Sequence, residues 1–174
     1  MMRTLVTGGS RSGKSSYAES LLLAEEEVDY LATSKNDPSD AEWTRRIELH
    51  RARRPKTWRT LETLDLASPI SAETNVPLMI DCLGVWLSRI MDENDFWASL
   101  DTSVLERPVK KLVEALENAS RPVVLVTNEV GWSLVPPDAG SRAYRDELGR
   151  LNASVANVCD TVVLCVAGQP LRIK

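Results

Sequence analysis

A glycine-rich segment near the amino end carries the clearest chemistry in the chain. It reads Gly8-Gly9-Ser10-Arg11-Ser12-Gly13-Lys14-Ser15, which fits the phosphate-loop pattern of glycine, any four residues, glycine, lysine and serine or threonine. Glycines let backbone N–H groups approach phosphate oxygens, Lys14 supplies a cation for the β- and γ-phosphates, and Ser15 offers a hydroxyl to Mg²⁺. We therefore expect the segment to bind a nucleoside triphosphate together with Mg²⁺.

The context of this segment favours a phosphate loop over the alternative of an ordinary glycine-rich turn. The segment follows the apolar run Thr4-Leu5-Val6 and precedes a helical pattern of apolar residues from Tyr17 to Leu22. A strand before and a helix after are the setting that the motif requires. A dinucleotide-binding fingerprint is excluded, because its first spacing of glycine, one residue, glycine is absent.

Two acidic residues follow apolar runs that predict strands. Asp81 closes the run Leu78 to Asp81, and Glu129 comes shortly after the run Val123 to Val126. P-loop enzymes usually place an acidic residue at the carboxyl end of a neighbouring strand, where it organises Mg²⁺ and water. We predict that Asp81 joins Ser15 at the metal. An N-cap role before the apolar stretch from Leu83 stays open for Asp81, and the role of Glu129 is left open.

The only histidine, His50, lies in a strongly basic segment. Six of the twelve residues from Arg45 to Lys56 are Arg or Lys, in a chain with 21 basic and 25 acidic residues and a net charge of −4. The segment is therefore a local anion site, and phosphate is a natural ligand for it. Among arginines an imidazole tends to stay neutral, and it can act as an acid, a base or a nucleophile. A solvated surface histidine is the alternative, and spacing does not decide between them.

The remaining patterns predict one α/β domain over residues 1–174. Short, mostly β-branched runs predict strands, and apolar residues three and four apart between Tyr144 and Val158 predict a helix. Wholly apolar strands that alternate with helices indicate a parallel sheet covered on both faces. A capping box at Ser39 to Glu42 predicts a helix that ends before Pro55. The predicted strands span residues 4–6, 28–32, 76–82, 123–126 and 161–166, with a possible short strand within 57–63, whereas residues 64–75 give no clear pattern.

Composition bears on the binding partners and the location of the protein, and on its cysteines and tryptophans. The net charge of −4 disfavours a broad electrostatic contact with nucleic acid. No apolar run approaches the roughly 20 residues of a membrane helix, and the start lacks the apolar core of a secretory signal, so we expect a cytoplasmic protein. Cys82, Cys159 and Cys165 lack metal-ligand spacing, which favours buried, reduced thiols. The tryptophans, among them Trp43, Trp86, Trp97 and Trp132, are expected chiefly in the core.

Several of these motifs occur in the order of one enzyme family. Together they resemble the bifunctional adenosylcobinamide kinase/adenosylcobinamide-phosphate guanylyltransferases of cobalamin biosynthesis, over nearly the whole chain. The phosphate loop is generic, whereas the arginine-flanked histidine and the Thr-Asn-Glu-Val-Gly segment are more specific. The matching segments are Gly8 to Ser15, Leu31-Ala32-Thr33-Ser34, Arg46-Ile47, His50-Arg51, Arg54-Pro55, Trp58 to Glu62 and Thr127 to Gly131.

The resemblance implies a RecA-like P-loop fold, a homotrimer and two consecutive reactions. A nucleoside triphosphate, GTP or ATP, first phosphorylates the aminopropanol hydroxyl of adenosylcobinamide, and GTP then guanylylates the product. In this family a histidine attacks the α-phosphate of GTP and carries GMP, and His50 is the matching position. A one-step P-loop small-molecule kinase is the alternative, which would not need His50. A nucleotide-driven interaction module is a third and weaker reading.

The resemblance also implies which residues contact the nucleotide. Lys14 and Ser15 would hold the triphosphate in both reactions, and nearby arginines would stabilise the charge on the phosphoryl oxygens. The family often has glutamate at the position of Asp81 and a second histidine at that of Leu49, so His50 alone can be the carrier here. The further residues that fall at nucleotide-contacting positions are Thr33, Ser34, Lys35, Arg51, Arg53, Arg54 and Glu62, with Asp81 beside the metal.

Overall fold

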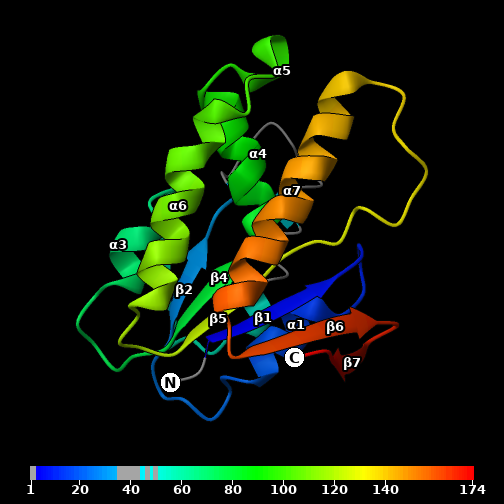
Figure 1. The fold of residues 1–174 in the computed structure, drawn as a ribbon. Coiled ribbons are helices and arrows are strands. Elements are labelled where there is room, and N and C mark those ends of the chain that lie inside the picture. Colours follow the sequence, from blue (N-terminus) through cyan, green and yellow to red (C-terminus); the bar gives the residue numbers. More distant parts are fainter. Residues whose placement is uncertain (1–2, 35–43, 46–47, 49–50) are drawn as a thin grey trace.

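A mainly parallel β-sheet with helices on both faces forms the centre of the molecule (Figure 1). The computed structural model describes residues 3–34, 44–45, 48 and 51–174. Within that part the sheet has seven strands in the order β3-β2-β4-β5-β1-β6-β7. All neighbouring strands are parallel except β6 and β7, which are antiparallel. The strands are β1 (Arg3–Gly8), β2 (Asp29–Ala32), β3 (Arg59–Glu62), β4 (Leu78–Asp81), β5 (Val123–Val126), β6 (Thr161–Val166) and β7 (Gln169–Arg172).

Helices connect the strands and cover both faces. α1 lies on one face, and α4, α6 and α7 lie on the other (Figure 1). The helices are α1 (Lys14–Ser20), α3 (Ala67–Ile70), α4 (Leu83–Glu93), α5 (Phe96–Ser99), α6 (Ser103–Glu117) and α7 (Ala139–Val158). Residues 44, 45, 48 and 51–53 are also helical. The capping box that predicts the start of that helix, at 39–42, lies outside the described residues.

Alternation along the central strands builds two apolar layers. On β5, Val123 and Leu125 pack into the layer of α4, α6 and α7, whereas Val124 and Val126 pack into the layer of α1. Successive side chains of a strand point to opposite faces, so a strand covered on both sides must be apolar throughout. The wholly apolar runs of the sequence are therefore explained, and the predicted sheet with helices on both faces is confirmed.

The predicted elements agree closely with the observed ones. The runs at 123–126 and 161–166 coincide with β5 and β6, the possible strand within 57–63 is β3, and the periodic helix lies in α7. The segment 64–75, which gave no clear pattern, contains the four-residue helix α3. Strand β7 was not predicted. It is exposed along its whole length and contains Pro170, which is tolerated because β7 is an edge strand.

The cysteines are buried, whereas some of the tryptophans are exposed. Cys82, Cys159 and Cys165 are buried and unpaired, as predicted, and burial raises the pKa of the Cys82 thiol to about 11. Trp86 is buried, but Trp97 and Trp132 are 43% and 74% exposed, so the expectation of core tryptophans is wrong for these two. Trp43 lies outside the described residues.

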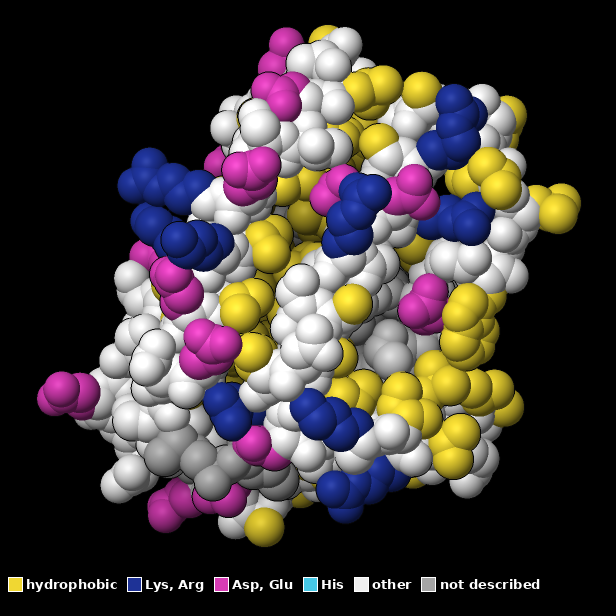
Figure 2. Space-filling view, in the orientation of Figure 1, with side chains coloured by type: hydrophobic (Ala, Val, Ile, Leu, Met, Phe, Trp, Pro, Cys, Tyr) yellow, Lys and Arg dark blue, Asp and Glu magenta, His cyan; other side chains and the backbone are white. Residues whose placement is uncertain are grey.

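Exposed hydrophobic side chains gather along one side of the molecule. In Figure 2 they lie mainly on the right, where Figure 1 shows the loop before α7 and the strands β6 and β7. The exposed hydrophobic residues of these segments are Trp132, Leu134, Val135, Val166, Leu171 and Ile173. Among the described residues, no helix has the length and apolarity needed to cross a membrane.

A buried ion pair fixes the amino end of β2. The Asp29 carboxylate accepts a hydrogen bond of 2.6 Å from the buried Arg121 guanidinium and one of 2.8 Å from the exposed Arg59. Arg121 also donates to the carbonyls of Val76 and Pro69. Burial raises the pKa of Asp29, but the hydrogen bonds from Arg59 and Arg121 outweigh it, so the net pKa is lowered. This arrangement ties β2 to the segments before β4 and β5.

We expect Asp29→Ala to lower the free energy of unfolding at pH 7 by about 3–5 kcal/mol, because it leaves the Arg121 charge buried without its partner. Asp160→Ala is the control. Asp160 pairs with Arg3 at 2.8 Å but is 39% exposed, so its loss should cost about 0–1 kcal/mol.

Urea unfolding at several pH values measures both effects. Because the folded pKa of Asp29 is lowered, its contribution is complete above its ordinary pKa of about 3.9. It is lost as the pH falls below that value and through the folded pKa. Equal losses for the two variants at pH 7 would contradict the assigned role of the buried pair.

Candidate active site

The phosphate loop depends on glycine at two positions that have different constraints. Gly13 has φ 91° and is the N-cap residue of α1. A Cβ there would lie 3.0 Å from the Cα of Gly168, and a Cβ on Gly8 would lie 2.5 Å from the carbonyl oxygen of Cys165. Side chains rarely adopt the first conformation, and the second contact leaves no space for one. The loop can therefore adopt this backbone conformation only with glycine at positions 8 and 13.

Backbone hydrogen bonds fix the loop to the sheet. The amide of Gly168, in the turn between β6 and β7, donates to the Ser12 carbonyl over 3.0 Å, and the amide of Glu129 donates to the Gly8 carbonyl over 3.0 Å. The buried Ser12 hydroxyl has no hydrogen-bond partner among the described residues. Buried polar groups normally have partners, so this unsatisfied hydroxyl fits a loop that binds a polar ligand.

Lys14 and Ser15 form the first turn of α1, directly after the loop. Lys14 is only 8% exposed, and its ammonium donates to the Gly9 carbonyl over 3.1 Å. The cation is thus held over the loop rather than extended into solvent. Ser10 and Arg11 are exposed at the loop tip. The loop has the local geometry that cradles a nucleotide phosphate chain.

Asp81 ends β4, two strands away from β1, because β5 lies between them. Asp81 pairs in register with Val126, and Val126 pairs with Val6, so all three strands end near the loop. The N-cap residue of α4 is Cys82, so the capping role considered for Asp81 is wrong. A serine hydroxyl and a carboxylate are oxygen ligands of the kind that Mg²⁺ prefers, and Ser15 and Asp81 fit that ion.

The basic segment 51–54 packs against the elements that carry the loop. Arg51 pairs with Glu62 at 3.0 Å, and Arg53 pairs with Glu19 of α1 at 3.2 Å. The guanidinium carbon of Arg54 lies 3.5 Å from the centre of the Tyr30 ring. All three arginines predicted to stabilise phosphoryl oxygens are thus held by groups on α1, β2 or β3. His50 lies outside the described residues, so its role stays a prediction.

Two residues that sequence reasoning missed complete this cluster. The Tyr30 hydroxyl donates to the Asp81 carboxylate over 2.8 Å. Burial and the Asp81 charge raise the pKa of Tyr30 well above 10, so it remains a neutral donor. Burial likewise raises the pKa of Glu19, although Arg53 opposes the shift. A phenol within a buried strand needs a partner, which was an available signal for Tyr30, whereas Glu19 gave none.

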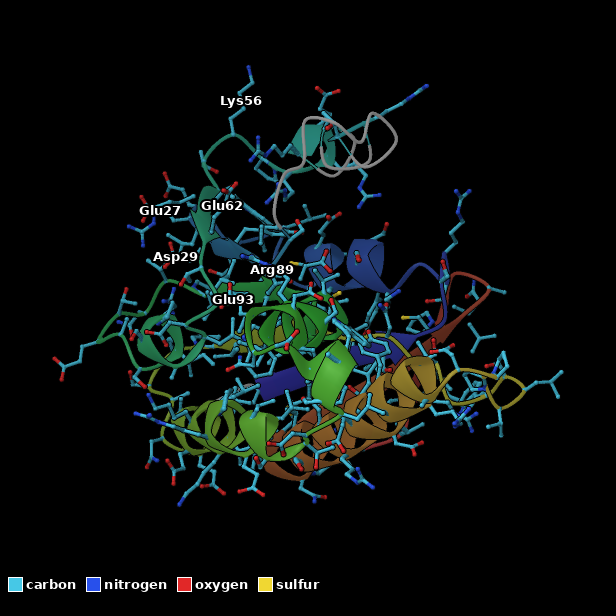
Figure 3. The ribbon with its side chains drawn as sticks, turned by 90° about the horizontal axis from the view of Figure 1, so that it is seen from above. Glu27, Asp29, Lys56, Glu62, Arg89 and Glu93 are labelled. Atoms are coloured by element: carbon cyan, nitrogen blue, oxygen red, sulfur yellow. The ribbon has the colours of Figure 1, made fainter. Side chains whose placement is uncertain are left out.

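The end of β2 contains the other predicted nucleotide contacts. The Thr33 side chain is fully buried, donates to the Cys82 carbonyl over 2.8 Å and accepts from the Cys82 amide over 2.9 Å. Arg89, which points toward Glu93 in Figure 3, donates to the Thr33 carbonyl. Thr33 thus links β2 to β4 through its side chain. Nucleotide contacts by Thr33, Ser34 and Glu62 stay predictions, and Lys35 lies outside the described residues.

The Thr-Asn-Glu-Val-Gly segment follows β5 beside the loop. The Thr127 hydroxyl donates to the Asn152 side chain on α7, which in turn donates to the Asn128 carbonyl. The Glu129 carboxylate accepts from the Gly131 amide over 2.8 Å. These bonds shape the segment, and the bond from the Glu129 amide to the Gly8 carbonyl holds it against the loop. They give Glu129 a structural role and leave a chemical role open.

Comparison with solved structures supports the fold. The chain superimposes on a prototypical ATPase from the type III secretion system of pathogenic bacteria with a TM-score of 0.56 and 16% identity. The match covers 94% of this chain and 50% of the ATPase, so the chain spans about half the length of that protein. At this identity the likeness shows that the chain shares the overall fold of that protein and nothing of its activity or substrate.

Sequence comparison is more specific. The chain is 40% identical to the bifunctional adenosylcobalamin biosynthesis protein CobP of Pseudomonas aeruginosa, over 99% of this chain and 98% of that protein. It is 36% identical to the corresponding protein CobU of Escherichia coli, over 99% of this chain and the whole of the relative. The profile of the family described as cobinamide kinase / cobinamide phosphate guanyltransferase matches residues 4–173. With its phosphate loop and the docked arginine segment, the chain belongs to the cobinamide kinase / cobinamide phosphate guanyltransferase family.

Proposed function

We propose that this protein phosphorylates adenosylcobinamide and then transfers GMP from GTP to the product through a histidine-bound intermediate on His50. Membership of the family supports both reactions. The observation that carries the proposal is the docking of the basic segment 51–54 on α1, the helix that begins with Lys14 and Ser15. One site can therefore present phosphate-loop groups and several arginines to the same triphosphate. We further expect action in the cytoplasm without a nucleic-acid partner.

In the kinase reaction the phosphate loop holds the triphosphate of GTP or ATP. Lys14 stabilises the charge that develops on the transferred γ-phosphoryl group, and the loop amides bind its neighbours. Mg²⁺, held by Ser15 and Asp81, would supply further neutralisation of the phosphate oxygens when bound. The substrate hydroxyl oxygen bonds to the γ-phosphorus, the bond from the γ-phosphorus to the bridging oxygen breaks, the nucleoside diphosphate leaves, and the hydroxyl proton passes to solvent.

In the guanylyl transfer a neutral imidazole nitrogen of His50 attacks the α-phosphorus of GTP. An N–P bond forms, the bond from the α-phosphorus to the bridging oxygen breaks, and pyrophosphate leaves. An oxygen of the substrate phosphate then attacks the same phosphorus and releases His50. The covalent carrier divides one difficult displacement into two, and Arg51, Arg53 and Arg54 balance the phosphoryl charge in both.

A one-step small-molecule kinase is the alternative to this proposal. It would use the phosphate loop, Lys14 and Asp81 in the same way, but it would not need His50. The description of the matching family names a guanyltransferase as well as a kinase, which supports the two-step proposal. Labelling of His50 separates the two functions directly.

We also propose a homotrimer, in line with the family resemblance. Large hydrophobic side chains are exposed in the loop before α7 and around β6 and β7 (Figure 2). Leu134 is 93% exposed and Leu171 is 59% exposed, and large exposed apolar patches commonly mark protein interfaces. These residues support self-association through this side of the molecule.

Gly13→Ala should weaken nucleotide affinity by about tenfold or more, because the left-handed backbone costs an alanine roughly 1–2 kcal/mol and its Cβ meets Gly168 at 3.0 Å. Equilibrium dialysis with GTP and ATP measures the change. Gly149→Ala on α7 is the matched control, since its Cβ would meet no atom within 4 Å. It should bind normally and gain about 0.5–1 kcal/mol in stability. Unchanged affinity for Gly13→Ala would refute the assigned loop.

His50→Ala should abolish covalent labelling by GTP radiolabelled at the α-phosphate, because the nucleophile is gone. The wild-type label should be acid-labile and alkali-stable, as expected of a phosphorus–nitrogen bond, with pyrophosphate released. The kinase step with adenosylcobinamide should persist in the variant, which serves as its own control for folding. Label that survives in His50→Ala, or that never forms in the wild type, contradicts the proposed carrier.

Sedimentation equilibrium should give a mass three times that of the 174-residue chain. Leu134→Asp combined with Leu171→Asp should shift the protein toward monomer, because burial of charge at an apolar interface is unfavourable. Glu117→Lys, an exposed substitution at the end of α6, is the control and should leave the mass unchanged. A monomeric wild type would overturn the trimer proposal.

A further inference from the structure

Tyr30 connects the acidic and basic parts of the site. Its hydroxyl lies 2.8 Å from the Oδ2 atom of Asp81, and its ring lies under the Arg54 guanidinium, 3.5 Å from ring centre to carbon. Tyr30 itself is only 4% exposed. A ring packed this tightly has little freedom. The Tyr30 side chain therefore restrains the positions of both the Asp81 carboxylate and the Arg54 guanidinium.

Strand register explains how one tyrosine reaches both groups. On the parallel pair β2 and β4, Tyr30 is aligned with Met79 and Ala32 with Asp81. Residues two apart on a strand point to the same face, so Met79 and Asp81 both share the α1 face with Tyr30. The phenol reaches Asp81, two residues beyond its aligned partner Met79, and Arg54 lies over one face of its ring. A shift of one residue in either strand would remove this contact.

Glu19 anchors the next arginine to the phosphate-loop helix. It is 7% exposed and accepts from Arg53 over 3.2 Å. Glu19 stands five residues after Lys14 on α1, so Arg53 is tied to the helix that holds the loop lysine. The pair differs from Arg51–Glu62, in which both side chains are more than half exposed. An anchor with a buried carboxylate restrains its arginine more strongly than an exposed pair.

The negative charge of the site has to be offset by Arg53 and Arg54. Burial, and to a smaller extent the Asp81 carboxylate, raises the pKa of Glu19, and a bound triphosphate would add further negative charge to that of the two carboxylates. Arg53 and Arg54 act on these groups with the opposite sign. Without them a like-charged cluster would disfavour phosphate. The two arginines thus make the acidic metal side of the site compatible with an anionic ligand.

From this geometry we infer that Tyr30 and Glu19 are positioning residues. Tyr30 orients the Asp81 carboxylate for Mg²⁺ and holds Arg54 beside it, and Glu19 holds Arg53 against the phosphate loop. The inference rests on the proposed function, because it assigns these residues to the nucleotide–metal site. It predicts that the hydroxyl and the ring of Tyr30 have separable effects.

Nucleotide binding at increasing Mg²⁺ concentration tests the inference. Tyr30→Phe removes the bond to Asp81 and keeps the ring, so the Mg²⁺ concentration at half-maximal GTP binding should rise about tenfold, as for one hydrogen bond to a charged group. Affinity at saturating Mg²⁺ should stay within about twofold. Tyr30→Leu should in addition lower that affinity by about fivefold, as expected for loss of a cation–π contact.

Coupling between residues provides a second readout. Tyr30→Leu and Arg54→Ala should be non-additive in GTP affinity, because each variant removes the same contact. Glu19→Gln should lower GTP affinity at saturating Mg²⁺ by about threefold to tenfold without moving the Mg²⁺ midpoint. Tyr144→Phe is the matched control. It removes a partly buried hydroxyl, which donates to the Gly84 carbonyl over 3.1 Å, and should change neither quantity.

These binding measurements can be interpreted whether or not the proposed histidine carrier is correct. Failure of wild-type protein to form the histidine label defeats the proposed carrier, while the Mg²⁺ midpoints of nucleotide binding still decide the role of Tyr30. Thermal unfolding is measured for every variant. If Tyr30→Phe loses melting temperature to the same extent as Tyr144→Phe and keeps the wild-type Mg²⁺ midpoint, Tyr30 is only structural and the inference is overturned.

Discussion

The close approach between the phosphate loop and the turn after β6 is the constraint on which the site depends. Gly13 faces Gly168, and Gly8 faces the Cys165 carbonyl, at separations that leave no room for side chains. β1 pairs with β5 on one side and with β6 on the other, and this pairing fixes the position of the loop that follows β1. The ends of the neighbouring strands determine which side chains lie near the loop.

The arginine segment is held to this frame by contacts of unequal strength. Arg51 and Glu62 form an exposed pair, and such pairs contribute little in water. Arg53 and Arg54 instead contact Glu19 and Tyr30, which are almost fully buried. Rigid support of the groups that touch a ligand limits the reorganisation needed during the reaction. The buried anchors, rather than the number of basic residues, make the segment a defined part of the site.

Sequence reasoning reached the sheet and the loop because both depend on local, repeated patterns. β5 is apolar at every position, which a strand covered on both faces requires, and the phosphate loop combines fixed spacing with a strand and a helix. β7 escaped prediction because its exposed residues and Pro170 follow no burial pattern. Tyr30 and Glu19 escaped as site residues because their partners are 51 and 34 residues away along the chain, and such pairings follow from strand order rather than from local sequence.

Fold and substrate are specified by different parts of the molecule. The chain shares its overall fold with a protein that is only 16% identical to it, so the sheet alone does not define the family. The chain shares 36–40% identity with two bifunctional relatives across nearly its whole length. The features specific to this family therefore do not follow from the fold alone. The basic segment 51–54 contacts the sheet and α1 through Tyr30 and Glu19. In the proposed function, these few buried contacts give the P-loop scaffold a second group of phosphate-binding residues.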